Sequence, residues 1–286
     1  MINQKLKIIE CPRDAMQSWK NIIPTKQKIE YLSLLGTVGF DTIDCGSFVS
    51  SKLIPQMADT AEVLAAADLG DSNSKLLVIV ANVRGAEEAI GHQNINYLGF
   101  PFSVSSTFQH LNANSSIKES FESVKTIQSL CNTHGKEQVV YISMAFGNPY
   151  KDEYNEKIVL TTIEKIAAIG IHVISLADTV GLATPSQIAS LVKQTVHNFP
   201  EHEIGVHLHS KTENREDKID AAFDNGCLRF DGAIKGFGGC PMSGSELIGN
   251  MDTGWMIRYF EKKGYLNTID DNALKQAEIM ASKIFV

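Results

Sequence analysis

Residues 172–209 read HVISLADTVGLATPSQIASLVKQTVHNFPEHEIGVHLH. The two ends of this stretch, His172–Leu176 and Ile204–His209, are short and rich in apolar residues, which is typical of buried strands. Between them, Thr184 and Gln187 form a capping box, a pattern in which two side chains satisfy free backbone groups at the start of a helix. A strand, a helix and a second strand predict one unit of a parallel sheet.

The same alternation of short strands and helices runs through the whole 286-residue chain. It is typical of a parallel sheet with helical connections. We expect eight strands, at Leu6–Cys11, Thr42–Cys45, Leu76–Ala81, Tyr97–Phe102, Val139–Met144, His172–Leu176, Ile204–His209 and Phe230–Ile234. Eight such units in this length favour an α/β fold with a closed (β/α)8 TIM barrel over an open doubly wound sheet. Residues 1–286 are therefore expected to form a single domain.

Local signals support the helices between these strands. A second capping box lies at Ser116–Glu119. Gly39, Gly170 and Gly226 each stand where a helix ends and a strand begins, a point at which a residue that tolerates positive φ closes the turn. After the eighth unit, Asp271–Phe285 predicts an extra C-terminal helix.

The composition excludes several classes of partner. The formal net charge is -7 and Lys and Arg do not cluster, so a surface for nucleic acid or for an anionic membrane is not expected. The longest apolar runs, such as Leu76–Ala81, are far shorter than the roughly 20 residues needed to cross a bilayer. The first residues lead into a strand without a signal or transit segment, which predicts a cytoplasmic protein. Five cysteines without CxxC spacing are expected to be reduced thiols.

Polar residues at the carboxyl ends of the predicted strands mark the expected site, because TIM barrels carry their active sites at that end. These residues are Arg13, Asp14, Asp44, Asp178, His207 and His209.

The two histidines form the most informative pattern. A spacing of two within a strand places both imidazole rings on one face, where they can share a metal ion. Alone, such a pair has a second interpretation, as two structural histidines. Asp14 adds a charged oxygen from another strand end, and a mixed set of imidazole and oxygen ligands suits Mn²⁺, Mg²⁺ or a related divalent ion. The combination predicts a metal site.

Arg13 and Cys240 each have two interpretations. Beside a metal, the guanidinium of Arg13 can stabilise an oxyanion that the metal does not reach; away from one, it would cap a helix or lie in solvent. Cys240 lies in Phe237–Pro241, where paired glycines permit a mobile loop that places a thiol over the barrel mouth. The other interpretation of Cys240 is a bystander thiol.

At these residues the chain resembles the 3-hydroxy-3-methylglutaryl-CoA lyase branch of the metal-dependent aldolase and Claisen-type barrel superfamily. The resemblance runs nearly from end to end. It is carried by Glu10–Asp14 with Gln17, by Ser47–Ser50 and Ile54–Met57, by Ile174–Leu176 with Asp178 and Thr179, by Val206–His209, and by Gly238–Pro241. The second and last of these segments are the more specific, because condensing relatives differ there.

The resemblance implies a role for each matching residue. The divalent-metal ligands would be Asp14, His207, His209 and Asn250. Arg13 would polarise the thioester carbonyl, and Cys240 would be the thiol of the mobile loop. The further active-site positions would be Gln17, Tyr141 and Asp178, with Lys20 near the acyl-CoA.

The implied reaction is a metal-dependent retro-Claisen cleavage of 3-hydroxy-3-methylglutaryl-CoA to acetyl-CoA and acetoacetate, with Mg²⁺ or Mn²⁺ as the cofactor. An adjacent base would remove the proton of the 3-hydroxyl group, cleavage of the carbon–carbon bond would leave a thioester enolate, and an acid from the loop would protonate the enolate carbon. Members of this family are homodimers that bind an acyl-CoA and serve leucine degradation and ketone body metabolism, and the resemblance extends these expectations to this chain.

Several positions depart from the family pattern. They are Ala15 in place of Gly, Asp44 in place of Glu, Ser106 in place of Glu, Val139 in place of Arg, Ala177 in place of Gly and Ser210 in place of Asp. The change at Asp44 shortens the reach of the carboxylate by one carbon–carbon bond, roughly 1.5 Å. Restoring Glu would raise turnover if the backbone has not moved to compensate, and lower it if the pocket has been rebuilt around Asp44.

Two alternatives follow from these departures. One is a related lyase or condensing enzyme that acts on a different 3-hydroxyacyl-CoA or hydroxy acid. The other is a barrel scaffold with impaired catalysis, which the changed residues around the site would support. Retention of all four expected metal ligands counts against the scaffold, because nothing structural requires them as a set.

Overall fold

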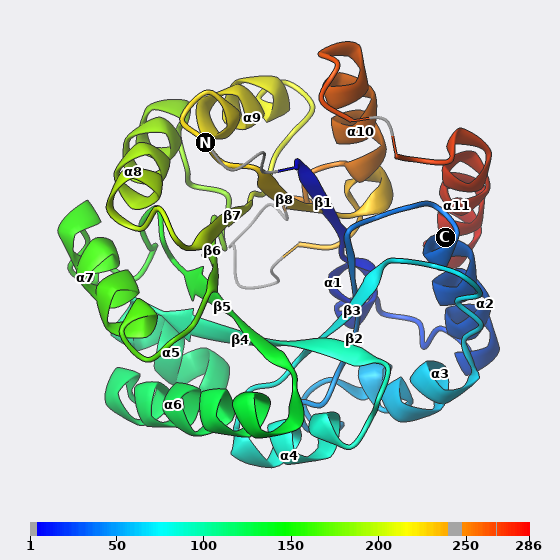
Figure 1. Ribbon diagram of the computed structural model, residues 1–286, viewed down its shortest axis with the longest axis horizontal. Coiled ribbons are helices and arrows are strands. Elements are labelled where there is room, and N and C mark those ends of the chain that lie inside the picture. The colour runs from blue at the N-terminus through cyan, green and yellow to red at the C-terminus, as the bar shows by residue number, and fades with distance from the viewer. Residues whose placement is uncertain (1–4, 240–247, 267) are drawn as a thin grey trace.

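Eight parallel strands close into a barrel in chain order, and helices surround it on the outside (Figure 1). The computed structural model describes residues 5–239, 248–266 and 268–286. The strands are β1 (Lys7–Glu10), β2 (Thr42–Ser47), β3 (Lys75–Ile79), β4 (Ile95–Ser103), β5 (Glu137–Ser143), β6 (Val173–Ala177), β7 (Glu203–His207) and β8 (Arg229–Gly232). All eight predicted strands are present, and the (β/α)8 TIM barrel is confirmed.

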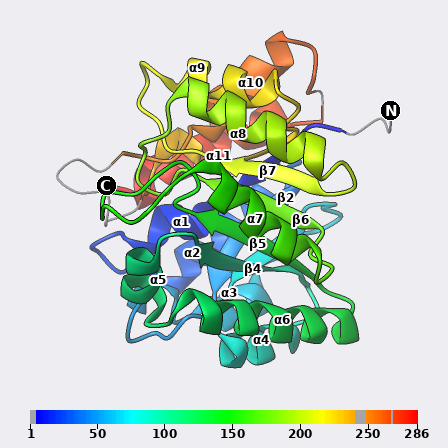
Figure 2. The same cartoon turned by 90° about the vertical axis from the view of Figure 1, so that its left-hand side faces the viewer.

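Most of the helices form the outer layer, which Figure 2 shows from the side, whereas α1 lies inside their ring in Figure 1. Their bounds are α1 (Pro12–Gln17), α2 (Thr25–Gly36), α3 (Thr60–Ala66), α4 (Val83–Ile90), α5 (Ser106–Ala113), α6 (Ile117–His134), α7 (Glu156–Ala167), α8 (Pro185–Asn198), α9 (Arg215–Phe223), α10 (Thr253–Lys262) and α11 (Asp271–Ile284), with 3₁₀ turns η1 (Pro55–Met57) and η2 (Ile234–Gly236). The predicted extra C-terminal helix is α11, which packs beside α2.

The barrel closes where β1 pairs with β8. Ile8 lies opposite Phe230 and Glu10 lies opposite Gly232, and the amide of Cys11 continues the ladder with a 2.8 Å hydrogen bond to the carbonyl of Gly232. This pairing joins the two ends of the sheet, so the residues that follow β1 lie next to those that follow β7 and β8.

The helix-forming signals in the sequence are confirmed. In α8, the amide of Gln187 donates to Oγ1 of Thr184 over 3.3 Å, and the amide of Thr184 donates to Oε1 of Gln187 over 3.0 Å. The apolar stripe of this helix is buried at Ile188, Leu191 and Val192. The second capping box, at the start of α6, makes the same pair of contacts.

Strands seven and eight end earlier than predicted. Strand seven was expected to continue to His209 but ends at His207, and strand eight was expected to reach Ile234 but ends at Gly232. The reason is a second partner: Leu208 accepts a 3.1 Å hydrogen bond from the amide of Met251, and His209 pairs with Asn250 in an antiparallel bridge. The chain after each strand therefore leaves the barrel ladder to pair with residues 250–252.

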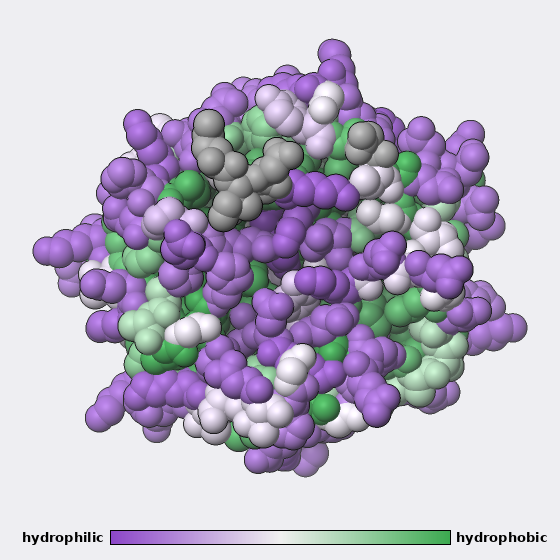
Figure 3. Space-filling view, viewed as in Figure 1, coloured by the Kyte–Doolittle hydropathy of each residue, from purple (hydrophilic) through white to green (hydrophobic). Residues whose placement is uncertain are grey.

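The outer surface is mainly polar. Hydrophilic residues cover most of the face shown in Figure 3, with smaller apolar patches between them. Within the described ranges, no helix combines the length and the apolar character that crossing a membrane would require. Four cysteines, Cys11, Cys45, Cys131 and Cys227, are buried free thiols.

The capping box of α8 gives a prediction about stability. Thr184→Ala removes the side-chain acceptor at the start of the helix and is expected to lower the free energy of unfolding by about 1 kcal/mol. Urea denaturation measures the change. The control is Lys193→Ala at an exposed position in the same helix, which should change the free energy by less than about 0.5 kcal/mol. Equal effects of the two substitutions would contradict the role of the cap.

Candidate metal centre

Asp14, His207 and His209 converge at the carboxyl ends of the strands. Each offers one ligand atom, and these atoms all lie within 4.8 Å of one another. Asp14 stands in α1, directly after β1, while His207 ends β7 and His209 follows it. The structure therefore brings together three of the four residues expected to bind a metal, in one compact group.

Asn250, the fourth expected ligand, lies against this group. Its Nδ2 donates to Oδ2 of Asp14 over 2.8 Å and to the carbonyl of Phe237 over 2.9 Å. Its Oδ1 is buried and has no hydrogen-bond partner among the described residues, and the same holds for Nδ1 of His209. A buried amide oxygen and a buried imidazole nitrogen beside an ionised carboxylate form a set of nitrogen and oxygen donors that fits a divalent ion.

The pKa values of Asp14 and His209 favour the protonation states in which these residues bind a metal ion. Burial alone would raise the pKa of Asp14, but the charges of Arg13 and the two histidines lower it to about 2. Burial lowers the pKa of His209 to about 3, and His207 adds to this effect. At neutral pH the carboxylate is ionised and the His209 ring is neutral, which are the forms that bind metal ions.

Arg13 is held by three side chains. Its Nε and Nη2 contact the carboxylate of Asp44, with a shortest distance of 2.5 Å, and its Nη1 donates to Asp14 over 3.1 Å and to Gln17 over 2.8 Å. Burial would lower the pKa of Arg13, but Asp44 and Asp14 raise it well above its ordinary value, so the guanidinium stays charged. The shorter side chain of Asp44 thus reaches Arg13 directly.

A cavity of about 380 Å³ opens beside these groups. Of the residues predicted for the site, those that line it are Arg13, Asp14, Gln17, Tyr141, His207 and His209. Apolar side chains, including Val49, Ile79 and Phe108, form other parts of its wall. A larger hollow of about 510 Å³ lies near the starts of β1, β2 and β3, and neither group of candidate metal ligands found in the described residues borders it.

Comparison with known proteins agrees with this geometry. The family model described as HMGL-like matches residues 5–281. The chain belongs to the HMGL-like family.

Relatives of this HMGL-like chain include the mitochondrial hydroxymethylglutaryl-CoA lyase of Mus musculus, 32% identical over 253 residues that cover 87% of this chain and 76% of the relative. The cytoplasmic 3-hydroxy-3-methylglutaryl-CoA lyase of Danio rerio is 31% identical over 87% of this chain and 73% of the relative. Among solved structures, an HMG-CoA lyase from Acenitobacter baumannii in complex with coenzyme A and 3-methylmalate superposes with a TM-score of 0.91, at 30% identity, over 100% of this chain and 92% of that one.

Three other predicted site residues of this HMGL-like chain, Asp44, Asp178 and Lys20, do not line the cavity. Asp44 is buried, and its carboxylate binds the guanidinium of Arg13. Asp178 is buried in an ion pair with Lys218, at 2.7 Å, and does not line the cavity. Lys20 is exposed just after α1. Cys240 lies outside the described residues.

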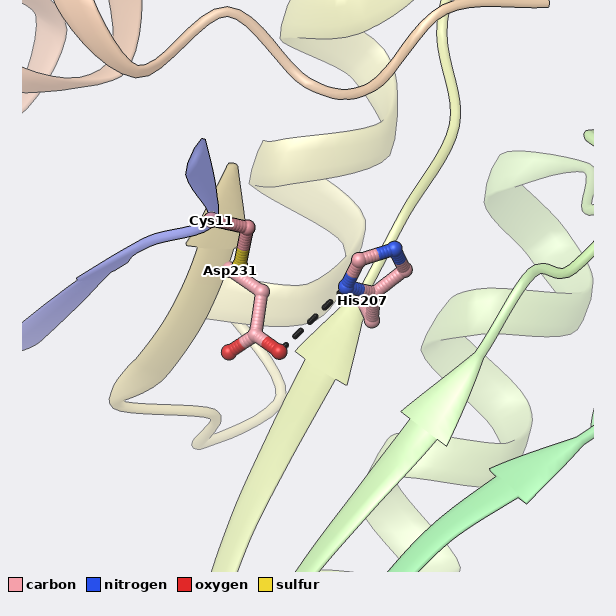
Figure 4. A group of neighbouring side chains, drawn as sticks. All are labelled: Cys11, His207 and Asp231. Atoms are coloured by element: carbon pink, nitrogen blue, oxygen red, sulfur yellow. Dashed lines mark hydrogen bonds and ion pairs between the residues drawn. The ribbon is translucent and has the colours of Figure 1, made fainter. Parts of the chain in front are cut away.

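Asp231 contacts the candidate metal centre but was not predicted from the sequence. Oδ2 of Asp231, on β8, lies 3.3 Å from Nδ1 of His207, and Figure 4 shows the two side chains facing each other. The contact raises the pKa of His207 above its ordinary value, although burial alone would lower it. A carboxylate on one ring nitrogen fixes the orientation of a histidine and leaves the other nitrogen for a metal. The signal that could have revealed it is a charged residue within a short buried strand.

Cys11, which Figure 4 places beside Asp231, forms a second group with His207 and Asp231 that could hold an ion. Burial and the nearby carboxylates raise the pKa of this thiol well above its ordinary value. Because a cysteine binds a metal as thiolate, this second group is the weaker candidate.

The contact between Asp231 and His207 predicts a loss of metal affinity. Asp231→Asn keeps the size of the side chain but removes the charge that orients His207, so Mn²⁺ should bind about 10- to 100-fold more weakly. Titration of metal-free protein with Mn²⁺ measures the dissociation constant. Asp220→Asn, the same substitution on α9, is the control and should leave the constant unchanged; an unchanged constant in both variants would exclude this role for Asp231.

Proposed function

We propose that the chain is a divalent-metal-dependent carbon–carbon lyase that cleaves 3-hydroxy-3-methylglutaryl-CoA to acetyl-CoA and acetoacetate by a retro-Claisen reaction. The observation that carries this proposal is the group of Asp14, His207 and His209 with the charged Arg13 on the wall of the same cavity. The lyases to which the chain is similar, over most of its length, support it.

In this proposal, the metal ligands are Asp14, His207, His209 and Asn250. When bound, Mg²⁺ or Mn²⁺ would act as a Lewis acid and lower the pKa of the 3-hydroxyl group of the substrate. Gln17 and Asn250 each donate a hydrogen bond to Asp14, so its carboxylate is held in place before a metal ion binds.

Arg13 is the group that stabilises the developing negative charge on the thioester oxygen. A guanidinium has five N–H bonds. Contacts with Asp44, Asp14 and Gln17 account for four of them, since Nε donates to Asp44, Nη1 donates twice and Nη2 donates once. The remaining N–H of Nη2 has no acceptor among the described residues and is available to an oxyanion. Fixed donors of this kind lower the barrier because they need no rearrangement during the reaction.

Asp44 then acts through Arg13. Its carboxylate meets the guanidinium at two points from a buried position, and it does not border the cavity. We therefore assign Asp44 the role of a positioning residue, in place of the catalytic role expected from the sequence.

Tyr141, Lys20 and Cys240 complete the proposed site. Burial raises the pKa of Tyr141 well above its ordinary value, so its hydroxyl group stays protonated and can donate to the substrate. Lys20, exposed near α1, would contact the coenzyme A moiety, and Cys240 would supply the acid that protonates the enolate carbon. A single catalytic domain, a homodimer, a cytoplasmic location and a place in leucine degradation and ketone body metabolism belong to the same proposal and rest on the resemblance.

Removal of the metal tests the proposal. Protein treated with a chelator should not release acetyl-CoA from 3-hydroxy-3-methylglutaryl-CoA, and addition of Mg²⁺ or Mn²⁺ should restore the reaction. Mass spectrometry of the products, with a panel of other 3-hydroxyacyl-CoA thioesters in parallel, identifies the substrate. Full turnover without metal would refute the metal site, and no product from any thioester would favour a non-catalytic scaffold.

The contact between Asp44 and Arg13 gives a second prediction. Asp44→Glu adds a methylene group to a side chain that is buried and already touches its partner, so it should displace Arg13 and lower kcat by up to about 10²-fold. Steady-state kinetics measure the effect, and Asp224→Glu at an exposed position is the control. A rise in kcat would show instead that the shorter carboxylate is a defect of the site.

A further inference from the structure

A buried lysine on a helix of the outer layer contacts the backbone of the proposed metal site. Lys218 lies on α9, and only 2% of its side chain is exposed. Its Nζ donates to Oδ2 of Asp178 over 2.7 Å and to the backbone carbonyl of His209 over 2.7 Å. One ammonium group therefore connects a carboxylate after β6 to the backbone of an expected metal ligand.

Asp178 is fixed by its own neighbours. Its Oδ1 accepts a 2.9 Å hydrogen bond from the amide of Ala183, and its backbone amide donates to the carbonyl of His207 over 2.9 Å. The pair of Lys218 and Asp178 thus binds the backbone carbonyls of both histidines in the metal centre.

His209 needs such a support because it lies beyond the end of β7, where the parallel ladder no longer holds the backbone. The remaining backbone contacts of this segment are made with residues 249–251 through the antiparallel bridge. A buried carbonyl without its hydrogen-bond donor is unfavourable, and this favours a shift of the backbone toward another partner. Any such movement displaces the imidazole attached to the same residue.

Packing alone does not explain a buried charge at this position. Taking an ammonium and a carboxylate out of water is unfavourable, and apolar side chains of similar volume are often equally stabilising or more so. The length of a lysine side chain and its several donors allow one residue to bind Asp178 and His209 at once.

We propose that Lys218, together with Asp178, is a positioning residue that holds His209 where it can bind the metal ion. This inference rests on the proposed function, because that function assigns His209 as a ligand. Neither Lys218 nor Asp178 borders the cavity, so their effect on the reaction passes through the metal site.

The experiment measures the affinity of metal-free protein for Mn²⁺ by calorimetric titration, without any substrate. The variant Lys218→Met/Asp178→Asn removes both charges, so that no uncompensated ion is left buried. It should bind Mn²⁺ at least 10-fold more weakly than the parent protein, as expected when the support of a ligand is lost.

The chain offers a matched control in Lys28 and Asp59. Lys28 is also buried, binds a carboxylate oxygen of Asp59 at 2.7 Å and donates to the backbone carbonyl of Gln56. Lys28→Met/Asp59→Asn removes the same kinds of contact at a pair that neither borders the cavity nor binds a backbone carbonyl of an expected metal ligand. The dissociation constant of the control should stay within 2-fold of the parent value, and thermal denaturation checks that both double variants are folded.

The titrations distinguish failure of the proposed metal-dependent function from failure of the positioning role of Lys218 and Asp178. If the parent protein does not bind Mn²⁺, the proposed metal-dependent function fails. If the parent binds and Lys218→Met/Asp178→Asn binds within 2-fold of it, or if the control weakens binding as much, the positioning role is overturned.

If the double variant does not fold, Asp178→Asn replaces it. Loss of the carboxylate charge leaves the ammonium of Lys218 uncompensated and should weaken Mn²⁺ binding at least 3-fold. An unchanged constant in that variant overturns the inference.

Discussion

The pairing of β1 with β8 closes the barrel and determines where the residues of the site lie. It places the residues after the first strand beside those after the seventh and eighth. Asp14 and Asn250 are 236 positions apart in the chain, yet their side chains meet at 2.8 Å. The candidate metal centre is built across this seam, and a sheet that remained open between β1 and β8 would separate its parts.

Ion pairs between buried side chains hold the charged groups in and around the site in place. Burial removes water that would otherwise solvate Arg13, Asp44, Asp178 and Lys218, so each charge lies against an opposite one. Pairs of this kind hold side chains in one geometry, because any departure leaves a buried charge without compensation. The positive charge of Arg13 keeps Asp14 ionised against the effect of burial, whereas burial itself keeps His209 neutral. The charged network therefore sets both the geometry and the protonation of the site.

The barrel interior shows how departures from the family pattern are accommodated. The resemblance calls for an arginine at position 139 on β5, where this chain has a buried valine. The chain buries a different arginine, Arg229, at the start of β8, where Gly205 on β7 leaves room for it: a Cβ atom added to Gly205 would lie 2.9 Å from Cδ of Arg229. A guanidinium thus remains inside the barrel, although another strand supplies it. At Asp44, in contrast, the shorter carboxylate reaches Arg13 directly.

Several features of this protein follow from local patterns in the amino-acid sequence. The eight strands, the capping boxes of α6 and α8, the extra helix α11 and the group of Asp14, His207 and His209 could all be predicted, because they follow from periodicity, from residues near the helix ends and from the rule that strand ends carry the site. Only the tertiary structure decided which partner each polar side chain takes. Asp178 binds Lys218, Asp231 binds His207, and His209 leaves the strand to pair with Asn250. Periodicity states the face on which a side chain lies, whereas its partner depends on contacts between elements far apart in the chain and on the burial that those contacts create.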